Sequence, residues 1–380
     1  TTRHSAAELQ RQFFRLGLSF DVHVNNDYTY LTVSGLSESM VEGLRLMEHI
    51  MEHMQPDEAA LNNMKADVLR RRQHAKQNRN FVLRRALGSY ARYGADSPFT
   101  YRLDEGEVHA LQAEALIRRL QRLSDYEHTV HYYGPASMET VAATIRQYHK
   151  RAPQLKPVPE SRSFEQPYTA ANEVLFLDFP IVQADIMLVS RGTPHFNLDE
   201  FQLSEWYNEY FGYGLSSIVF QEIRESRALA YSSFAYYSSP DRLDQPHYLQ
   251  AYLGTQPDKL QEAIPALTGI LHEMPVLEGQ AQQARHSILR RIESERIVPG
   301  RYFWESLTAR RLGFDKDMRE DLYQRLQDSD MGDLLDFQQK HVRGRAYKHV
   351  VLGSADRMDW AALEQVGPVR KLSMEEVFGY

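Results

Sequence analysis

The hydrophobic positions of the chain follow two alternating patterns. Residues 28–33, YTYLTV, are rich in β-branched and aromatic side chains, which predicts a strand. Ser39 and Glu42 have the spacing of a capping box, and they open a predicted helix that ends before Pro56. The hydrophobic residues of this helix recur on one face, at positions 40, 41, 44, 47, 51 and 54. Asp57 can then cap a second helix, so the pattern predicts a strand followed by helices.

The same pattern returns later in the chain. Residues 28–54, YTYLTVSGLSESMVEGLRLMEHIMEHM, align without a gap on residues 248–274, YLQAYLGTQPDKLQEAIPALTGILHEM. The sequence LRR at 69–71 returns in the same register at 289–291. Self-similarity over this length indicates that one domain has been duplicated.

The two copies differ in what precedes the repeated strand. The second copy has strand patterns at 173–177 and 184–192 and a helical pattern at 198–211, all before Tyr248. The first copy has only 27 residues before Tyr28, about 48 fewer than the second. We therefore expect the first copy to lack its opening strands and its first helix.

A proline-rich stretch separates the copies, with four prolines between positions 153 and 167. We predict a first domain at 1–150, a linker at 151–170 and a second domain at 171–380. Strands followed by helical runs favour the α+β class. We expect each of the two homologous domains to be an antiparallel sheet with helices packed on one face.

Composition excludes several classes of function. The net charge is −7 and the Lys and Arg residues are scattered, so the chain lacks the basic stripe typical of a nucleic-acid-binding protein. It has no cysteine, which excludes disulfides and thiolate metal sites and leaves His, Asp and Glu as potential zinc ligands. No hydrophobic run approaches the ~18 residues of a membrane helix. The cellular compartment stays open.

The most specific motif is IRESRALAYSSFAYY, from Ile223 to Tyr237. It resembles the segment L-R-E-x-x-G-L-x-Y-S in the C-terminal domains of the pitrilysin/insulinase family of zinc metallopeptidases, except that Ala228 stands where that pattern has glycine. The glycine-rich turn at 212–217, followed by a helix, is similar to the same family. The resemblance covers nearly the whole chain.

The resemblance implies that this chain is the C-terminal, non-catalytic half of such a peptidase. In this family an H-x-x-E-H helix of the N-terminal half binds the zinc. We therefore expect no catalytic residue, metal site or cofactor in this chain, with zinc in the N-terminal half on the same polypeptide or on a partner chain. The expected substrate is a peptide.

The same resemblance implies that Arg224 and Tyr231 bind this substrate. A guanidinium can hold a peptide carbonyl or carboxylate, and a phenol can donate to the oxyanion of a tetrahedral intermediate. The alternative is structural: Arg224 would pair with a neighbouring Glu, and Tyr231 would lie in the core.

The chain also contains H-x-x-E-H itself, as His49, Glu52 and His53. The motif aligns on residues 269–273, in the helix after the repeated strand, whereas the zinc helix of the family comes before that strand. The hydrophobic face of the helix is nearly opposite the two histidines, so we expect them to face solvent. Downstream, Arg70, Arg71 and Arg72 would repel a metal ion.

Three functional hypotheses follow from the sequence. In the first, the chain closes the substrate chamber of a zinc-dependent metalloendopeptidase and is inactive alone. In the second, it is a catalytically inactive family member that serves as a peptide-binding or structural module. In the third, His49, Glu52 and His53 form a zinc peptidase centre.

Overall fold

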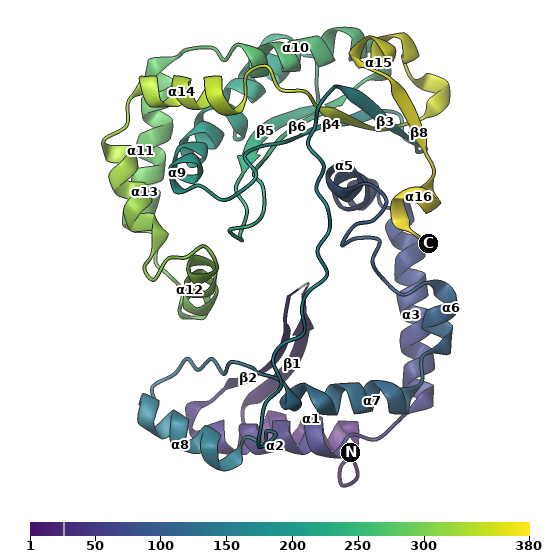
Figure 1. Cartoon of the computed structure of the whole chain (residues 1–380), viewed down its shortest axis with the longest axis vertical. Helices are drawn as coiled ribbons and strands as arrows, with labels where there is room; N and C mark the ends of the chain where they lie inside the picture. The colour runs from purple at the N-terminus through teal and green to yellow at the C-terminus, as the bar shows by residue number, and fades with distance from the viewer. Residues whose placement is uncertain (26) are drawn as a thin grey trace. The chain divides into compact units, whose positions relative to one another are not determined.

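The computed structural model describes residues 1–25 and 27–380 and divides them into two compact units (Figure 1). Unit 1 contains Thr1–His74 and Arg102–Ser163, and unit 2 contains Ala75–Tyr101 and Phe164–Tyr380. Helices and strands alternate in the chain, and the α+β class is confirmed. The domain boundaries that the repeat suggests stay a prediction.

Unit 1 is mainly helical. Its two strands, β1 (Leu18–Val24) and β2 (Thr29–Gly35), form an antiparallel hairpin in which Leu18 lies opposite Gly35. The helices are α1 (Ala6–Arg15), α2 (Met40–His53), α3 (Glu58–Gln77), α6 (Glu105–Ala110), α7 (Ala113–Gln121) and α8 (Met138–Tyr148). The predicted order of strand, helix and helix is therefore observed at β2, α2 and α3.

One of the two predicted helix caps is confirmed. The Asp57 carboxylate accepts a hydrogen bond from the Ala60 amide, 2.9 Å away, at the start of α3. The capping box at Ser39 and Glu42 is wrong, because Ser39 makes no side-chain cap bond. Ser39 ends a 3-10 turn (Ser37–Ser39) with φ −92° and ψ 8°, whereas a capping side chain needs an extended backbone to fold back onto the helix.

Unit 2 is built on a six-stranded sheet with the order β5-β6-β4-β7-β3-β8. The strands are β3 (Glu173–Asp178), β4 (Ala184–Arg191), β5 (Ser232–Ser238), β6 (Tyr248–Thr255), β7 (Lys348–Gly353) and β8 (Val369–Leu372). The sheet is mixed, not wholly antiparallel as expected: β3 pairs in parallel with both β7 and β8. The chain reverses between β3 and β4, and β7 lies between them antiparallel to β4, so β7 and β3 must run in the same direction.

Helices cover both faces of this sheet rather than the one face expected. On β4, Ile186 and Leu188 join the core formed with α9 (Leu198–Tyr207) and α10 (Leu260–His272). Met187 and Val189 point to the opposite face and pack in a second core with residues 82–91. Because side chains alternate along a strand, a strand that is buried on both faces has a continuous hydrophobic run, as β4 has from Ile186 to Val189.

The second core is covered by the helical segment 79–93, together with Val377 and Phe378 near the C-terminus. This segment consists of α4 (Arg79–Phe81), a wider π-helical stretch (Val82–Leu87) and α5 (Gly88–Tyr93). The remaining helices of unit 2 are α11 (Glu278–Ser294), α12 (Tyr302–Arg311), α13 (Met318–Gln327), α14 (Met331–His341), α15 (Trp360–Val366) and α16 (Met374–Phe378). Within residues 1–25 and 27–380, the helices are too short or too polar to cross a membrane.

Candidate substrate-binding site

The segment with the family motif is a helical turn followed by a sharp reversal. A π-helical stretch, Phe220–Ser226, carries Ile223 in the core and Arg224 next to it. The Ala228 amide donates to the Arg224 carbonyl at 3.2 Å, and the Leu229 amide donates to the Ile223 carbonyl at 3.0 Å. The first bond closes the helix end as in an αL motif, and the buried Leu229 follows directly after it.

Ala228 has a positive φ of 49°, which places it in the left-handed region. Glycine reaches this region without strain because it has no Cβ. The position where the family pattern has glycine therefore has the backbone that favours glycine. The chain still makes this sharp reversal, although alanine stands at position 228 where the family pattern has glycine.

The upstream glycines explain why the helix that precedes this segment comes so close to β5. A Cβ at Gly212 would overlap the backbone carbonyl of Ala235 in β5, and Gly214 has a φ of 99°. Gly212 therefore allows close contact with the strand, and Gly214 allows the turn that follows. The interpretation of this stretch as a tight turn before a helix agrees with this geometry.

Arg224 is exposed, and its partners are weak. Its guanidinium carbon lies 4.8 Å from the centre of the Phe220 ring, and its Nε lies 3.7 Å from a carboxylate oxygen of Glu225. The side chain is 44% exposed, and an exposed ion pair of this length contributes at most about 1 kcal/mol. The neighbouring-Glu contact expected from the structural alternative is present, but it leaves the guanidinium accessible.

Tyr231 lies on the surface and not in the core, because its side chain is 53% exposed. The Gln256 side-chain amide donates to its hydroxyl at 2.6 Å, and the Tyr231 backbone amide donates to the Gly254 carbonyl at 2.9 Å. The hydroxyl thus accepts one hydrogen bond and keeps its proton for donation. Among the described contacts, Tyr231 and Arg224 have separate partners and do not touch each other.

Tyr231 leads directly into β5, which is an edge strand. One side of β5 pairs with β6, with Ser232 opposite Gly254 and Ser238 opposite Tyr248. In the part of the chain that the structure describes, no strand lies along the other side. An open strand edge presents backbone N–H and C=O groups that a further strand can pair with. Arg224 and Tyr231 therefore precede a strand that can accept an extended peptide.

The histidines of the H-x-x-E-H motif are half-buried on α2, so the expectation that they face solvent is wrong. His49 Nε2 lies 3.0 Å from the Thr1 hydroxyl, and its ring centre lies 4.8 Å from that of His53. Partial burial lowers the pKa of His49, and the nearby positive charges of His53 and His4 lower it further. The first residues of the chain cover this side of α2, where the Thr2 amide donates to the His53 carbonyl at 3.0 Å.

The motif lacks the features of a zinc peptidase centre. Lys150 binds the Glu52 carboxylate and lowers its pKa, which makes Glu52 a weaker base. Among the described residues, no group of three or more His, Asp or Glu side chains is placed to hold a metal ion. The residues present therefore do not fit a bound catalytic zinc.

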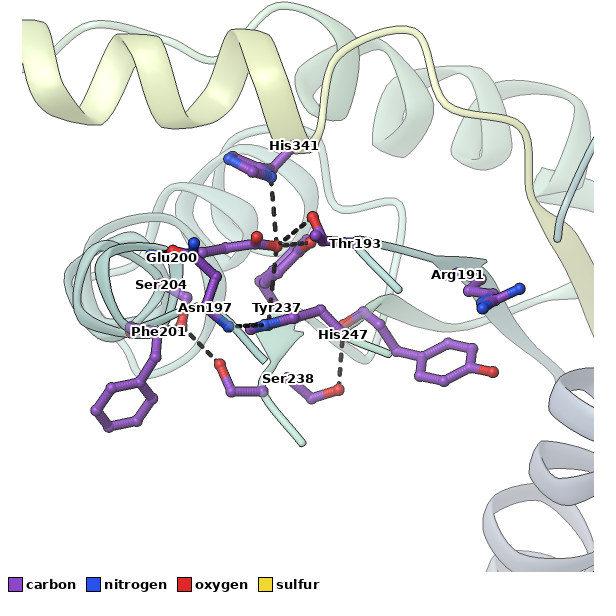
Figure 2. Close-up of polar contacts among 12 residues, drawn as sticks. Arg191, Thr193, Asn197, Glu200, Phe201, Ser204, Tyr237, Ser238, His247 and His341 are labelled. Carbon is purple, nitrogen blue, oxygen red and sulfur yellow. Dashed lines mark hydrogen bonds and ion pairs between the residues drawn. The ribbon is translucent and has the colours of Figure 1, made fainter. Parts of the chain in front are cut away.

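Sequence reasoning missed a buried polar cluster at the end of the sheet of unit 2 (Figure 2). Its centre is Glu200 of α9, whose carboxylate accepts hydrogen bonds from Thr193, at 2.9 Å, and from the Tyr237 hydroxyl. His341 Nδ1 lies 3.3 Å and His247 Nδ1 lies 3.7 Å from the same carboxylate oxygen. The side chains come from α9, β5, α14 and the loops before β6 and after β4, so the cluster joins five parts of the fold.

The electrostatics of this cluster are those of a compensated buried charge. Burial alone would raise the pKa of Glu200, but hydrogen bonds from His341 and Tyr237 and the nearby His247 lower it overall. Burial and the adjacent Glu200 raise the pKa of Tyr237, and burial lowers the pKa of His247. Because donors surround the carboxylate, we assign the cluster a structural role. The one signal of this cluster that the sequence offers is a helix cap, in which the Asn197 side chain accepts a hydrogen bond from the Glu200 amide.

Comparison with known proteins identifies the relatives of the chain. Residues 128–274 match the family described as the peptidase M16 inactive domain. A Rickettsia felis protein described as an uncharacterized zinc protease is 22% identical over 265 residues, which cover 69% of this chain and 62% of that protein. The match thus spans less than two thirds of that relative.

Two solved structures share the fold. The crystal structure of a peptidase M16 inactive domain from Pseudomonas fluorescens has a TM-score of 0.71 and 15% identity, over 94% of this chain and 86% of that one. A protease from Helicobacter pylori has a TM-score of 0.68 and 15% identity, over 93% of this chain and 86% of that one.

The match to the inactive domain includes the motif with Arg224 and Tyr231, whereas residues 49–53 lie outside it. The resemblance to the pitrilysin/insulinase peptidases that the sequence indicated is confirmed. Residues 128–274 of this chain match the inactive domain of the M16 peptidase family.

Proposed function

We propose that this chain is the non-catalytic half of a zinc-dependent metalloendopeptidase and binds an extended peptide for a catalytic half. The observation that carries the proposal is the position of Tyr231 and Arg224, both exposed, at the start of the edge strand β5 within the matched inactive domain. The catalytic half, on the same polypeptide or on a partner chain, would hold the zinc.

Each part of this site has a distinct role in peptide binding. The open edge of β5 supplies backbone donors and acceptors that pair with a peptide of any sequence, as in β-strand addition. The Tyr231 hydroxyl can donate to a carbonyl oxygen or to the oxyanion that develops from it. The Arg224 guanidinium can bind a carbonyl or a carboxylate.

A peptide-binding measurement tests the proposal. Fluorescence anisotropy of a labelled, unstructured peptide should show saturable binding to the whole chain. Tyr231→Phe and Arg224→Gln should each weaken binding about threefold to tenfold, because each removes one hydrogen-bonding group. Tyr213→Phe and Arg227→Gln, which change exposed residues of the same types nearby, should leave binding unchanged.

Two alternatives make different predictions. An inactive binding or structural module would bind the peptide but would not support cleavage by a catalytic half carrying an intact H-x-x-E-H helix. A peptidase centre at His49, Glu52 and His53 would give the chain alone hydrolytic activity after zinc loading, and His49→Ala would abolish it. We expect no hydrolysis by the chain alone, since Glu52 is bound to Lys150.

A further inference from the structure

The edge strand β5 has one aromatic face that lies at the margin of the second core and is only partly buried. Alternate residues of β5, Ser233, Ala235 and Tyr237, are buried, and the residues between them are half-buried or exposed. On this second face the Phe234 ring stacks on Tyr252 of β6, with ring centres 5.1 Å apart, and on Tyr236, with ring centres 6.1 Å apart.

Two arginines of residues 79–93 lie over aromatic rings on the same face. The guanidinium carbon of Arg84 lies 5.2 Å from the Phe234 ring centre and 5.8 Å from that of Tyr252. Arg92 lies 4.5 Å from the Tyr248 ring centre. The two arginines are eight residues apart in a helical segment, which corresponds to about 12 Å. Tyr248 and Tyr252 are four residues apart in β6, about 13 Å, so the two spacings match. Figure 1 shows α5 below the sheet, on the face opposite α10.

The contacts that the structure describes for these two guanidinium groups are with aromatic rings. Within the described residues neither Arg84 nor Arg92 forms an ion pair, whereas Arg79 on the same segment binds the buried Asp185. Arg84 is exposed and stays charged at any physiological pH. An aromatic ring holds the guanidinium flat and leaves its N–H edges free to bind an anion. This face is therefore locally positive in a chain whose net charge is −7.

The position of Arg84 determines which part of an added peptide it can reach. A strand added to the open edge of β5 would lie about 4.8 Å from it, with every second side chain on the Phe234 face. The long side chain of a glutamate at such a position can extend toward Arg84. Apolar side chains at these positions would contact Phe234 and Tyr236.

We infer that the β5 edge selects extended peptide segments with acidic side chains at alternate positions, which Arg84 binds beside the aromatic face of Phe234 and Tyr236. The inference rests on the proposed function and adds the class of substrate. Arg92 reinforces the positive charge of this face toward Tyr248.

Two peptides that differ only in charge test this inference. One has glutamate at every second position and valine between, and the other has glutamine in place of each glutamate. Anisotropy at low salt should show the glutamate peptide binding about threefold to tenfold more tightly, the range for one charge-assisted hydrogen bond. The preference should shrink at 0.5 M salt, where screening is strong.

Arg84→Gln should abolish the preference for the glutamate peptide and leave binding of the glutamine peptide unchanged. Arg85→Gln is the matched control, because Arg85 is an exposed neighbour with no aromatic ring beneath it among the described contacts. Equal binding of both peptides, or an equal loss in both variants, would overturn the inference and leave the proposed function standing. Failure of both peptides to bind would overturn the two together.

Discussion

At the scale of single residues, Ala228 is the strained position of the site. Its left-handed backbone costs roughly 1–2 kcal/mol for a residue with a Cβ, and glycine avoids this cost but loses more entropy on folding. Ala228→Gly should therefore raise the free energy of unfolding by about 0.5–1 kcal/mol in chemical denaturation. Ala230→Gly, two residues on, should lower it. A stabilisation in both variants would show that the φ of Ala228 is not the cause.

His349 gives the protein a sensitivity to acid. It is buried near the start of β7, and burial lowers its pKa to about 4. In the unfolded chain this histidine has a pKa near 6.5, so between pH 6.5 and pH 4 it binds a proton that the folded protein does not bind. The free energy of unfolding is therefore undiminished above about pH 6.5 and falls as the pH is lowered toward 4. Between pH 7 and pH 5 this loss is about 2 kcal/mol.

Replacement of this histidine should remove that loss. The difference in unfolding free energy between pH 7 and pH 5 should be about 2 kcal/mol smaller in His349→Leu than in the parent chain. His286→Leu, at an exposed histidine, should keep the parental difference. An unchanged pH dependence in His349→Leu would assign the acid sensitivity to other groups.

The sequence named two candidate substrate-binding residues, whose role stays a prediction, but it did not show their surroundings. Arg224 and Tyr231 could be named as candidates because they belong to one local motif, which lies just before β5. The Glu200 cluster and the contact of Arg84 with Phe234 join side chains far apart in the sequence. Such pairs carry no local periodicity, so no pattern in a single sequence could indicate them.

At the scale of elements, an ion pair joins the start of the helical segment 79–93 to the sheet, in addition to the hydrophobic contacts of the second core. Arg79 binds Asp185 of β4, whose carboxylate also accepts a hydrogen bond from the Tyr252 hydroxyl at 2.6 Å. Asp185 is fully buried, so removing its cation leaves a charge without compensation. Arg79 lies shortly after Ala75, the first residue of unit 2.

Arg79→Met should lower the free energy of unfolding by about 2–4 kcal/mol, somewhat less than for a fully buried pair, because Arg79 is partly exposed. The double variant Arg79→Met/Asp185→Asn should recover part of this lost unfolding free energy, since the buried carboxylate charge is then removed. The exposed Arg85→Met should change stability by less than about 0.5 kcal/mol. Chemical denaturation measures all three. An additive double variant would contradict the coupling.

Most elements of the repeat were predictable, because hydrophobic periodicity within 10 to 20 residues determines them. The helices α2, α3 and α10 and the strands β3 and β4 lie where the pattern predicts them. The mixed sheet was not predictable, because β7 enters it from far along the chain. The cover of the second face was missed for the same reason: Val82, Leu83 and Leu87 are hydrophobic, but the sequence does not say which sheet they pack against.

At the scale of the whole molecule, the two units differ greatly in buried hydrophobic surface. Among the described residues of unit 1, the buried hydrophobic side chains are Phe13, Leu61, Val108, Ala113 and Val141. Unit 2 has two large hydrophobic cores, one on each face of its sheet. Burial of apolar surface is the main favourable term in folding. Unit 1 therefore gains much less stabilisation per residue from hydrophobic burial than unit 2.

Hydrogen exchange followed by mass spectrometry should show this difference. Amides of unit 1, including those of α2 and α8, should exchange within seconds to minutes, because local opening there breaks few buried contacts. Amides of β4, β6 and β7 should stay protected for hours. Equal protection in the two units would mean that unit 1 gains stability from contacts other than buried hydrophobic side chains.

Unit 2 is discontinuous in the sequence, and this has a consequence for synthesis on the ribosome. The segment with Val82, Leu83 and Leu87 emerges long before β4, and β7, at the centre of the sheet, follows some 250 residues later. At roughly 5–20 residues per second, these side chains wait on the order of 10–50 s for their complete partner surface. The hydrophobic side chains of this segment therefore lack their full partner surface in the nascent chain until translation reaches β7.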